Sequence, residues 1–101
     1  MTTRLTAEHR REQIIQAAKQ LSHGGGLYDW SLDDVAQLVG ISRPGVRYYF
    51  HSVQKLRRRT INDAITQTDL DIVTQAVAKH DPLVKDIPNK LRQACGKFLT
   101  S

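Results

Sequence analysis

The chain has 101 residues, 40% of them hydrophobic and 25% charged, with a formal net charge of +5. These values are typical of one globular domain and exclude a disordered segment; no apolar run approaches the roughly 20 residues that cross a bilayer. Residues 1–4 lack the apolar core of a signal peptide, so we expect a cytoplasmic protein with no membrane partner.

The first expected helix runs from Thr6 to about Leu21. Its apolar residues recur at the spacing of one helix face, and they are Ile14, Ile15, Ala17, Ala18 and Leu21. Thr6 is the expected N-cap. The triplet at 24–26 is expected to end the helix as a flexible connection; no Gly-Lys-Ser/Thr follows it, so it is not a phosphate loop.

The second helix is expected to begin after Ser31. Ser31 and Asp34 have the spacing of a capping box, and Trp30 and Val35 that of a hydrophobic staple. The apolar residues expected on its buried face are Val35, Ala36, Leu38 and Val39. Gly40 then ends the helix, because glycine accepts the left-handed conformation that other residues resist.

A third, short helix is expected over residues 43–50, with Ser42 as its cap and Pro44 in its first turn. Three residues at helical spacing form its inner face, namely Val46, Tyr49 and Phe50. Four others point outward, namely Arg43, Gly45, Arg47 and Tyr48. Two helices joined by a tight turn, the second of them basic on its outer face, predict a DNA-binding helix-turn-helix.

Ser52 is expected to cap a fourth helix that starts near Val53, and an apolar stripe at helical spacing continues from there toward residue 80. It fits either one helix or two helices divided at 68–71. Residues 81–82 mark a break, and a last helix is expected to begin at 86–88, with Pro88 in its first turn. We therefore predict an all-α fold in which a helix-turn-helix region (1–55) is followed by two or three short helices (56–101), packed as one compact domain.

The basic excess lies in the half of the chain that contains the expected recognition helix. Residues 1–59 contain ten Lys/Arg and five Asp/Glu, whereas residues 60–101 contain five of each. Basic surfaces attract phosphates because binding releases counterions. Arg57–Arg59 spread over about 200 degrees of a helix, so at most two of them can face one DNA strand. The run fits a phosphate contact and a merely solvated helix face equally well.

From about Arg10 to Ile65, the chain resembles the N-terminal DNA-binding region of the TetR family of transcriptional repressors. The resemblance is carried by residues 11–18, 31–36 and 40–50, and by a junction in which Phe50, Ser52 and Leu56 follow the family's Phe-x-Ser-Lys-x-x-Leu pattern. Arg47 stands where the family usually has tyrosine, and Val53 stands where it has lysine. The roughly 40 remaining residues are an unusually short C-terminal part for this family, so no obvious small-molecule inducer is expected.

These observations predict a sequence-specific regulator, a repressor that binds a palindromic operator in double-stranded DNA as a homodimer. The residues expected to read bases are Arg43, Gly45, Arg47 and Tyr48. Those expected to contact phosphates are Ser31, Ser42, Tyr49, Lys55 and Arg10, with Arg4 as a further contact beside the groove. The expected dimer surface consists of Ile65, Ile72, Val73, Val77, Leu91, Cys95 and Phe98, although these residues can equally close the core of one chain.

The alternative function is a helical protein-interaction module whose basic face binds an acidic partner protein. It predicts little binding to any duplex and no loss when Arg43 or Arg47 is replaced. An enzyme is the weakest interpretation, because the four histidines have no metal-ligand spacing and no catalytic grouping is evident. No metal and no cofactor are expected, and Cys95 is expected to be a small buried residue.

Overall fold

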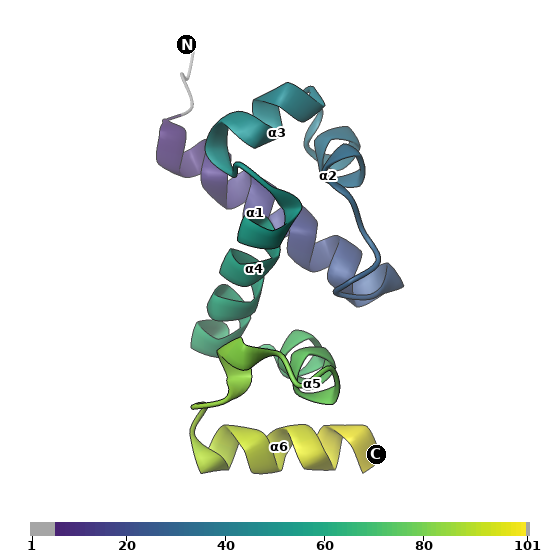
Figure 1. Cartoon of the computed structure of the whole chain (residues 1–101), viewed down its shortest axis with the longest axis vertical. Helices are drawn as coiled ribbons and strands as arrows, with labels where there is room; N and C mark the ends of the chain where they lie inside the picture. Colours follow the sequence, from purple (N-terminus) through teal and green to yellow (C-terminus); the bar gives the residue numbers. More distant parts are fainter. Residues whose placement is uncertain (1–5, 101) are drawn as a thin grey trace, which may run out of the picture.

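The computed structural model describes residues 6–100, which form helices and no strand, as the sequence predicts (Figure 1). The elements are α1 (Ala7–Gly25), α2 (Leu32–Val39), α3 (Arg43–Tyr49), α4 (Val53–Gln67), α5 (Leu70–Ala78), the short 3-10 helix η1 (Pro82–Val84) and α6 (Asn89–Thr100). Helices α1 to α3 form one end of an elongated molecule, α5 and α6 form the other, and α4 connects them. Within the described residues, no helix has both the length and the apolar character needed to cross a membrane.

Helix α1 begins at the predicted cap, where the Thr6 hydroxyl accepts a hydrogen bond from the backbone N–H of His9 at 3.1 Å. It continues past Leu21 and ends only at Gly26, whose φ is 116°. Ser22 stabilises this extra turn from inside the protein. Its hydroxyl donates to the Ala18 carbonyl at 2.7 Å and accepts from Trp30 Nε1 at 2.9 Å.

Helix α2 has the predicted caps at both ends. Ser31 and Asp34 form the capping box, with Asp34 N donating to Ser31 Oγ at 3.2 Å and Ser31 N donating to Asp34 Oδ2 at 2.8 Å. Gly40 adopts the left-handed conformation at φ 88°. Leu38 departs from the prediction, because its side chain is 44% exposed. Val35, which is buried, defines the inward face, and Leu38 lies to one side of it.

A first hydrophobic cluster holds α1, α2, α3 and the start of α4 together. Its buried members are Ile14, Ile15, Ala17, Ala18, Trp30, Val35, Ala36, Val46, Phe50 and Leu56. Trp30 and Val35, the residues of the expected staple, are both buried in it. The cluster fixes α3 by its inner face alone, and this leaves the other face of α3 to solvent.

The question left open by the sequence, one helix or two after residue 53, is resolved as two. Thr68 adopts a left-handed conformation with φ 56° and ends α4. Asp69 then caps α5, accepting from the backbone N–H of Ile72 at 3.4 Å. Helix α6 begins at Asn89, after the expected start at 86–88. Pro88 therefore precedes the helix rather than lying in its first turn as expected, and its carbonyl accepts a hydrogen bond from Arg92 N at 3.0 Å.

A second hydrophobic cluster lies at the other end of the molecule. Its buried members are Leu27, Ile61, Ala64, Ile72, Val73, Ala76, Val84, Ile87 and Cys95. This arrangement corrects part of the expected dimer surface, because Ile72, Val73 and Cys95 are buried within a single chain. Ile65, Val77 and Leu91 are partly buried against the same cluster, and Phe98 is 45% exposed.

The connection between α1 and α2 is fastened to the C-terminal helices, whereas the sequence suggested a flexible link. Gln75 of α5 accepts from Leu27 N at 2.6 Å, and Arg57 Nε of α4 donates to the Leu27 carbonyl at 3.1 Å. Tyr28 donates its hydroxyl proton to Asp81 at 2.9 Å. Burial and this hydrogen bond raise the pKa of Tyr28 above its ordinary value of 10.0.

Candidate nucleic-acid interface

The exposed face of α3 carries the basic side chains that the sequence placed there. Val46 is fully buried, while the side chain of Arg43 is 55% exposed and Tyr48 is 77% exposed. Arg47 is exposed as well. Because the inner residues anchor the helix, the guanidinium groups of the outer face are held at the surface and remain available to a partner.

The turn before α3 sets the position of this helix. The Ser42 hydroxyl accepts a hydrogen bond from Gly45 N at 3.2 Å. Pro44 lies in the first turn of α3, where backbone N–H groups have no partner within the helix, so the missing N–H of proline costs no hydrogen bond. Gly45 faces this turn, since a Cβ there would lie 3.4 Å from Ser42 Oγ and 3.5 Å from Ile41 Cδ1. These are ordinary contacts, so the backbone does not require glycine at this position.

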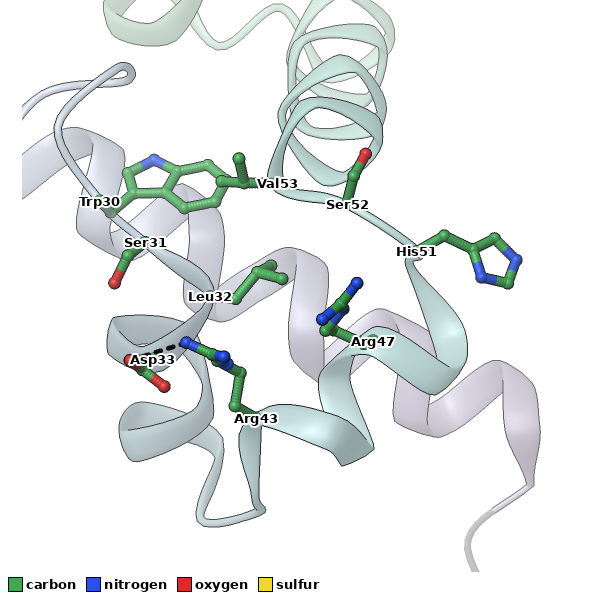
Figure 2. A pocket seen from close by; sticks show the side chains of 9 residues that line it. All are labelled: Trp30, Ser31, Leu32, Asp33, Arg43, Arg47, His51, Ser52 and Val53. Carbon is green, nitrogen blue, oxygen red and sulfur yellow. Dashed lines mark ion pairs between the residues drawn. The ribbon is translucent and has the colours of Figure 1, made fainter.

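An open groove of about 440 Å³ lies between the start of α2, the outer face of α3 and the start of α4. The residues that line it are Trp30, Ser31, Leu32, Asp33, Arg43, Arg47, His51, Ser52 and Val53 (Figure 2). Arg43 and Arg47 stand one turn apart on α3 and flank this groove. The fold thus brings Ser31 to the same surface as Arg43 and Arg47, although Ser31 lies more than ten residues before both of them in the sequence.

Asp33 is a member of this surface that sequence reasoning missed. Its Oδ2 lies 3.5 Å from Arg43 Nη1, and both side chains are more than half exposed. Asp33 lies in the first turn of α2, where the helix dipole stabilises an acidic side chain. This local role explains an acid at position 33 without any contact to Arg43, so the sequence gives no sign of the ion pair. Only the packing of α2 against α3 places Arg43 beside it.

The predicted phosphate contacts occupy different settings. Ser31 and Ser42 are exposed, but their hydroxyls already cap α2 and α3. Lys55 is exposed in the first turn of α4. Arg10 is partly buried and donates to Gln13 Oε1 at 3.0 Å. Arg4 lies outside the described residues.

Tyr49 is partly buried and packs against the first cluster. The guanidinium of Arg11 lies 5.7 Å from the centre of its ring, and the Tyr48 ring meets it edge-on at 5.0 Å between centroids. Arg11 therefore adds a basic group beside α3, on the helix that packs behind it. The sequence places Arg11 among the polar residues of the first helix, and its spacing does not indicate a contact with Tyr49.

The run Arg57–Arg59 is divided by the fold. Arg57 is partly buried, and its guanidinium lies 5.1 Å from the Trp30 ring and 5.5 Å from the Tyr28 ring. Arg58 and Arg59 are exposed. Arg57 is thus engaged in holding the α1–α2 connection, and only its two neighbours face solvent.

Among the described residues, no three His, Cys, Asp or Glu side chains come close enough together to hold a metal ion. The groove contains polar and basic groups around a few apolar side chains. Such a surface offers hydrogen-bond donors and positive charge to a partner that carries acceptors and negative charge.

A capped helix, a tight left-handed turn and a second short helix anchored by one face make this a helix-turn-helix protein. Comparison with known proteins agrees. The chain is 30% identical over 97 residues to the HTH-type transcriptional regulator EthR of Mycobacterium tuberculosis and of Mycobacterium bovis, an alignment that includes 96% of this chain and 44% of the relative. It is 33% identical over 70 residues to the uncharacterized HTH-type transcriptional regulator YfiR of Bacillus subtilis, with 66% of this chain and 34% of the relative aligned.

The chain is a TetR-like helix-turn-helix protein, as the sequence resemblance predicted. It spans less than half the length of these relatives, 44% in the case of EthR. No family model matches it, and no solved structure matches it significantly.

Proposed function

We propose that this chain binds double-stranded DNA as a transcription regulator, with α3 as its recognition helix. The observation that carries the proposal is the exposure of Arg43 and Arg47 on a short helix whose opposite face is buried. The names of the relatives, which are HTH-type transcriptional regulators and not enzymes, support the same function.

In the proposed complex, α3 enters the major groove with its exposed face toward the bases. Arginine pairs bidentately with O6 and N7 of guanine, the commonest specific contact, and each good pair adds roughly 1–3 kcal/mol of discrimination. Tyr48, the most exposed large apolar side chain of the helix, is suited to contact a thymine methyl group or a sugar. Gly45 contributes backbone rather than a side chain.

Phosphate contacts would hold the helix in register. Ser52 and Val53 at the start of α4 line one part of the groove, and Ser31 at the start of α2 lines another. Lys55 follows in the first turn of α4 and is exposed. Ser42, Arg10, Tyr49 and its neighbour Arg11 extend the polar surface along α3 and α1. Such contacts add affinity without reading sequence.

We further propose that two copies bind a palindromic operator and that the bound dimer represses transcription. One recognition helix contacts only a few base pairs, so two half-sites about one helical turn apart are needed for useful specificity. Phe98 of α6, with the partly buried Ile65, Val77 and Leu91, is the part of the predicted dimer surface that still reaches solvent. The three fully buried residues no longer belong to it.

The decisive experiment is selection of bound duplexes from a random pool, followed by affinity measurements on the selected duplex and on a scrambled one. Enrichment of a two-fold symmetric sequence is the expected result. The affinity should also fall with salt, on the order of 1000-fold between about 50 and about 200 mM if roughly six phosphates are contacted. Failure to enrich any duplex would contradict the proposal and favour the acidic protein partner instead.

A further inference from the structure

We propose that Asp33 is a positioning residue for base recognition, which holds Arg43 in the orientation that pairs with guanine. The inference rests on the DNA-binding function proposed above. It assigns a role to an acid at a surface that would otherwise be expected to be uniformly basic.

The position of Asp33 is the first observation. Among the described residues that line the groove, it is the one acid, and it faces the same opening as Arg43 and Arg47 (Figure 2). A carboxylate at a surface that approaches phosphates is electrostatically unfavourable, and in this groove the nearest compensating charge is the guanidinium of Arg43, whose Nη1 lies 3.5 Å from Asp33 Oδ2.

The geometry of the pair leaves Arg43 free to bind a second group. The guanidinium has five N–H donors in a planar fork, and the contact with Asp33 is made through Nη1. The other donors remain available for the two acceptors on the major-groove edge of guanine. A lysine has a single ammonium group instead of a planar guanidinium with donors on two edges, so it could not bridge a carboxylate and a base in this way.

The strength of the pair suits a positioning role. A contact of 3.5 Å is longer than a charge-assisted hydrogen bond of about 2.8 Å, and exposed ion pairs are weak. The carboxylate therefore favours one direction of a long, mobile side chain without sequestering it. Arg47, one turn further along α3, forms no ion pair with any residue that the structure describes.

The test measures discrimination one base pair at a time. Starting from the selected duplex, each base pair is changed in turn, and dissociation constants are determined for the wild-type protein, Asp33→Asn, Arg43→Ala and Arg47→Ala. We expect Asp33→Asn to reduce discrimination roughly threefold to tenfold at the base pairs that Arg43→Ala affects, and to leave unchanged those that Arg47→Ala affects. In an Arg43→Ala background, Asp33→Asn should have no further effect at these positions, because the two residues act as one unit.

Two controls separate positioning from charge and from folding. Asp86→Asn removes the same charge from the exposed turn before α6, at the other end of the molecule, and should leave the discrimination pattern unchanged. Asp33→Glu keeps a carboxylate and should retain more discrimination than Asp33→Asn. Thermal unfolding of each variant verifies that α2 remains folded.

The outcomes distinguish the two proposals. If the wild-type protein prefers no duplex, DNA recognition itself is refuted. If it prefers a duplex but Asp33→Asn tightens or weakens binding to all duplexes equally, recognition stands and the positioning role of Asp33 is overturned. The same conclusion follows if Arg43→Ala changes discrimination at no base pair.

Discussion

At the level of single residues, the arginines of this chain differ in what their guanidinium groups contact. Arg43 and Arg47 are exposed on α3, whereas Arg57 donates to a backbone carbonyl and stacks over two aromatic rings. The residue type is the same, but the surroundings leave the first two available for the proposed recognition of bases and engage the third in contacts within the fold. Substitutions should therefore affect different measurements.

Arg47→Ala is expected to weaken binding to the selected duplex by roughly tenfold or more while changing binding to scrambled DNA little, because a base contact is lost. Lys55→Ala is the matched control. It removes a proposed phosphate contact and should weaken binding to both duplexes about equally. Filter binding or fluorescence anisotropy at one fixed salt concentration measures both. Equal losses for the two variants on both duplexes would contradict the assignment of Arg47 to base reading.

Arg57→Ala is expected to lower the free energy of unfolding by roughly 1–3 kcal/mol, since the partly buried Leu27 carbonyl loses its donor and two aromatic rings lose a stacked cation. Urea unfolding followed by circular dichroism measures the change. Arg58→Ala removes the neighbouring, exposed arginine and should stay within about 0.5 kcal/mol of the wild type. Similar losses for both variants would show that the Arg57 contacts add no stability.

At the level of elements, short helices are delimited by local chemistry and oriented by burial. Five α-helices, α1 to α5, begin with a side-chain cap at a Ser, Thr or Asp, namely Thr6, Ser31, Ser42, Ser52 and Asp69. Caps fix where a helix starts but not which way it faces. The direction of α3 comes from Val46 and Phe50, which insert into the first cluster.

Gly40→Ala tests the turn between α2 and α3. A Cβ at Gly40 would contact nothing within 4 Å, so the cost comes from the left-handed backbone at φ 88° alone. We expect a loss of roughly 1 kcal/mol in the free energy of unfolding. Gly24→Ala is the opposite case, because Gly24 is helical and unobstructed, and it should stabilise the protein by about 0.5–1 kcal/mol. If Gly40→Ala instead raised the free energy of unfolding, the left-handed backbone at this position would not disfavour a side chain.

At the level of the whole molecule, two hydrophobic clusters are joined through the α1–α2 connection. Leu27 belongs to the second cluster, whereas Trp30, three residues later, belongs to the first. Across the same junction, Lys19 of α1 pairs with Asp63 of α4 at 3.0 Å, and His23 Nε2 lies 2.8 Å from Asp69 Oδ2. The C-terminal helices thereby position the end of α1, and the first cluster connects α1 to α2 and α3.

The Tyr28–Asp81 contact gives this junction a dependence on alkaline pH. Because the pKa of Tyr28 is raised in the folded protein, the unfolded chain loses the phenolic proton first as pH rises. The stabilisation is therefore complete below about pH 10, the pKa of an unperturbed tyrosine, and declines above it. We expect wild type to exceed Tyr28→Phe in stability at about pH 8, with the difference shrinking by about pH 11 in urea unfolding.

Tyr48→Phe serves as the control for this measurement, since Tyr48 is 77% exposed. Its difference from the wild type should not change between the two pH values. If the Tyr28→Phe difference also stayed constant, the hydrogen bond to Asp81 would contribute no pH-dependent stability.

Much of the fold follows from the sequence alone, because caps, turn glycines and helical periodicity act over a few residues. The N-caps of α1 to α4, the left-handed Gly40 and the outward Arg43, Arg47 and Tyr48 are all encoded locally and were predicted correctly. The division between α4 and α5 was left open, although residues 68–71 were named as its place, since Thr68 is a non-glycine residue in a left-handed conformation. Such a conformation leaves little trace in the local pattern.

The amino-acid sequence determined the class of this protein and the face of α3 that meets solvent, because both depend on spacing within one helix and one turn. Only the tertiary structure decided that Arg57 donates to the Leu27 carbonyl, that Ile72, Val73 and Cys95 close the core of one chain, and that Asp33 lies beside Arg43. Each of these depends on contacts between residues on different helices. Periodicity shows which side of a helix is apolar, but the packing of the whole chain selects the neighbour that covers it.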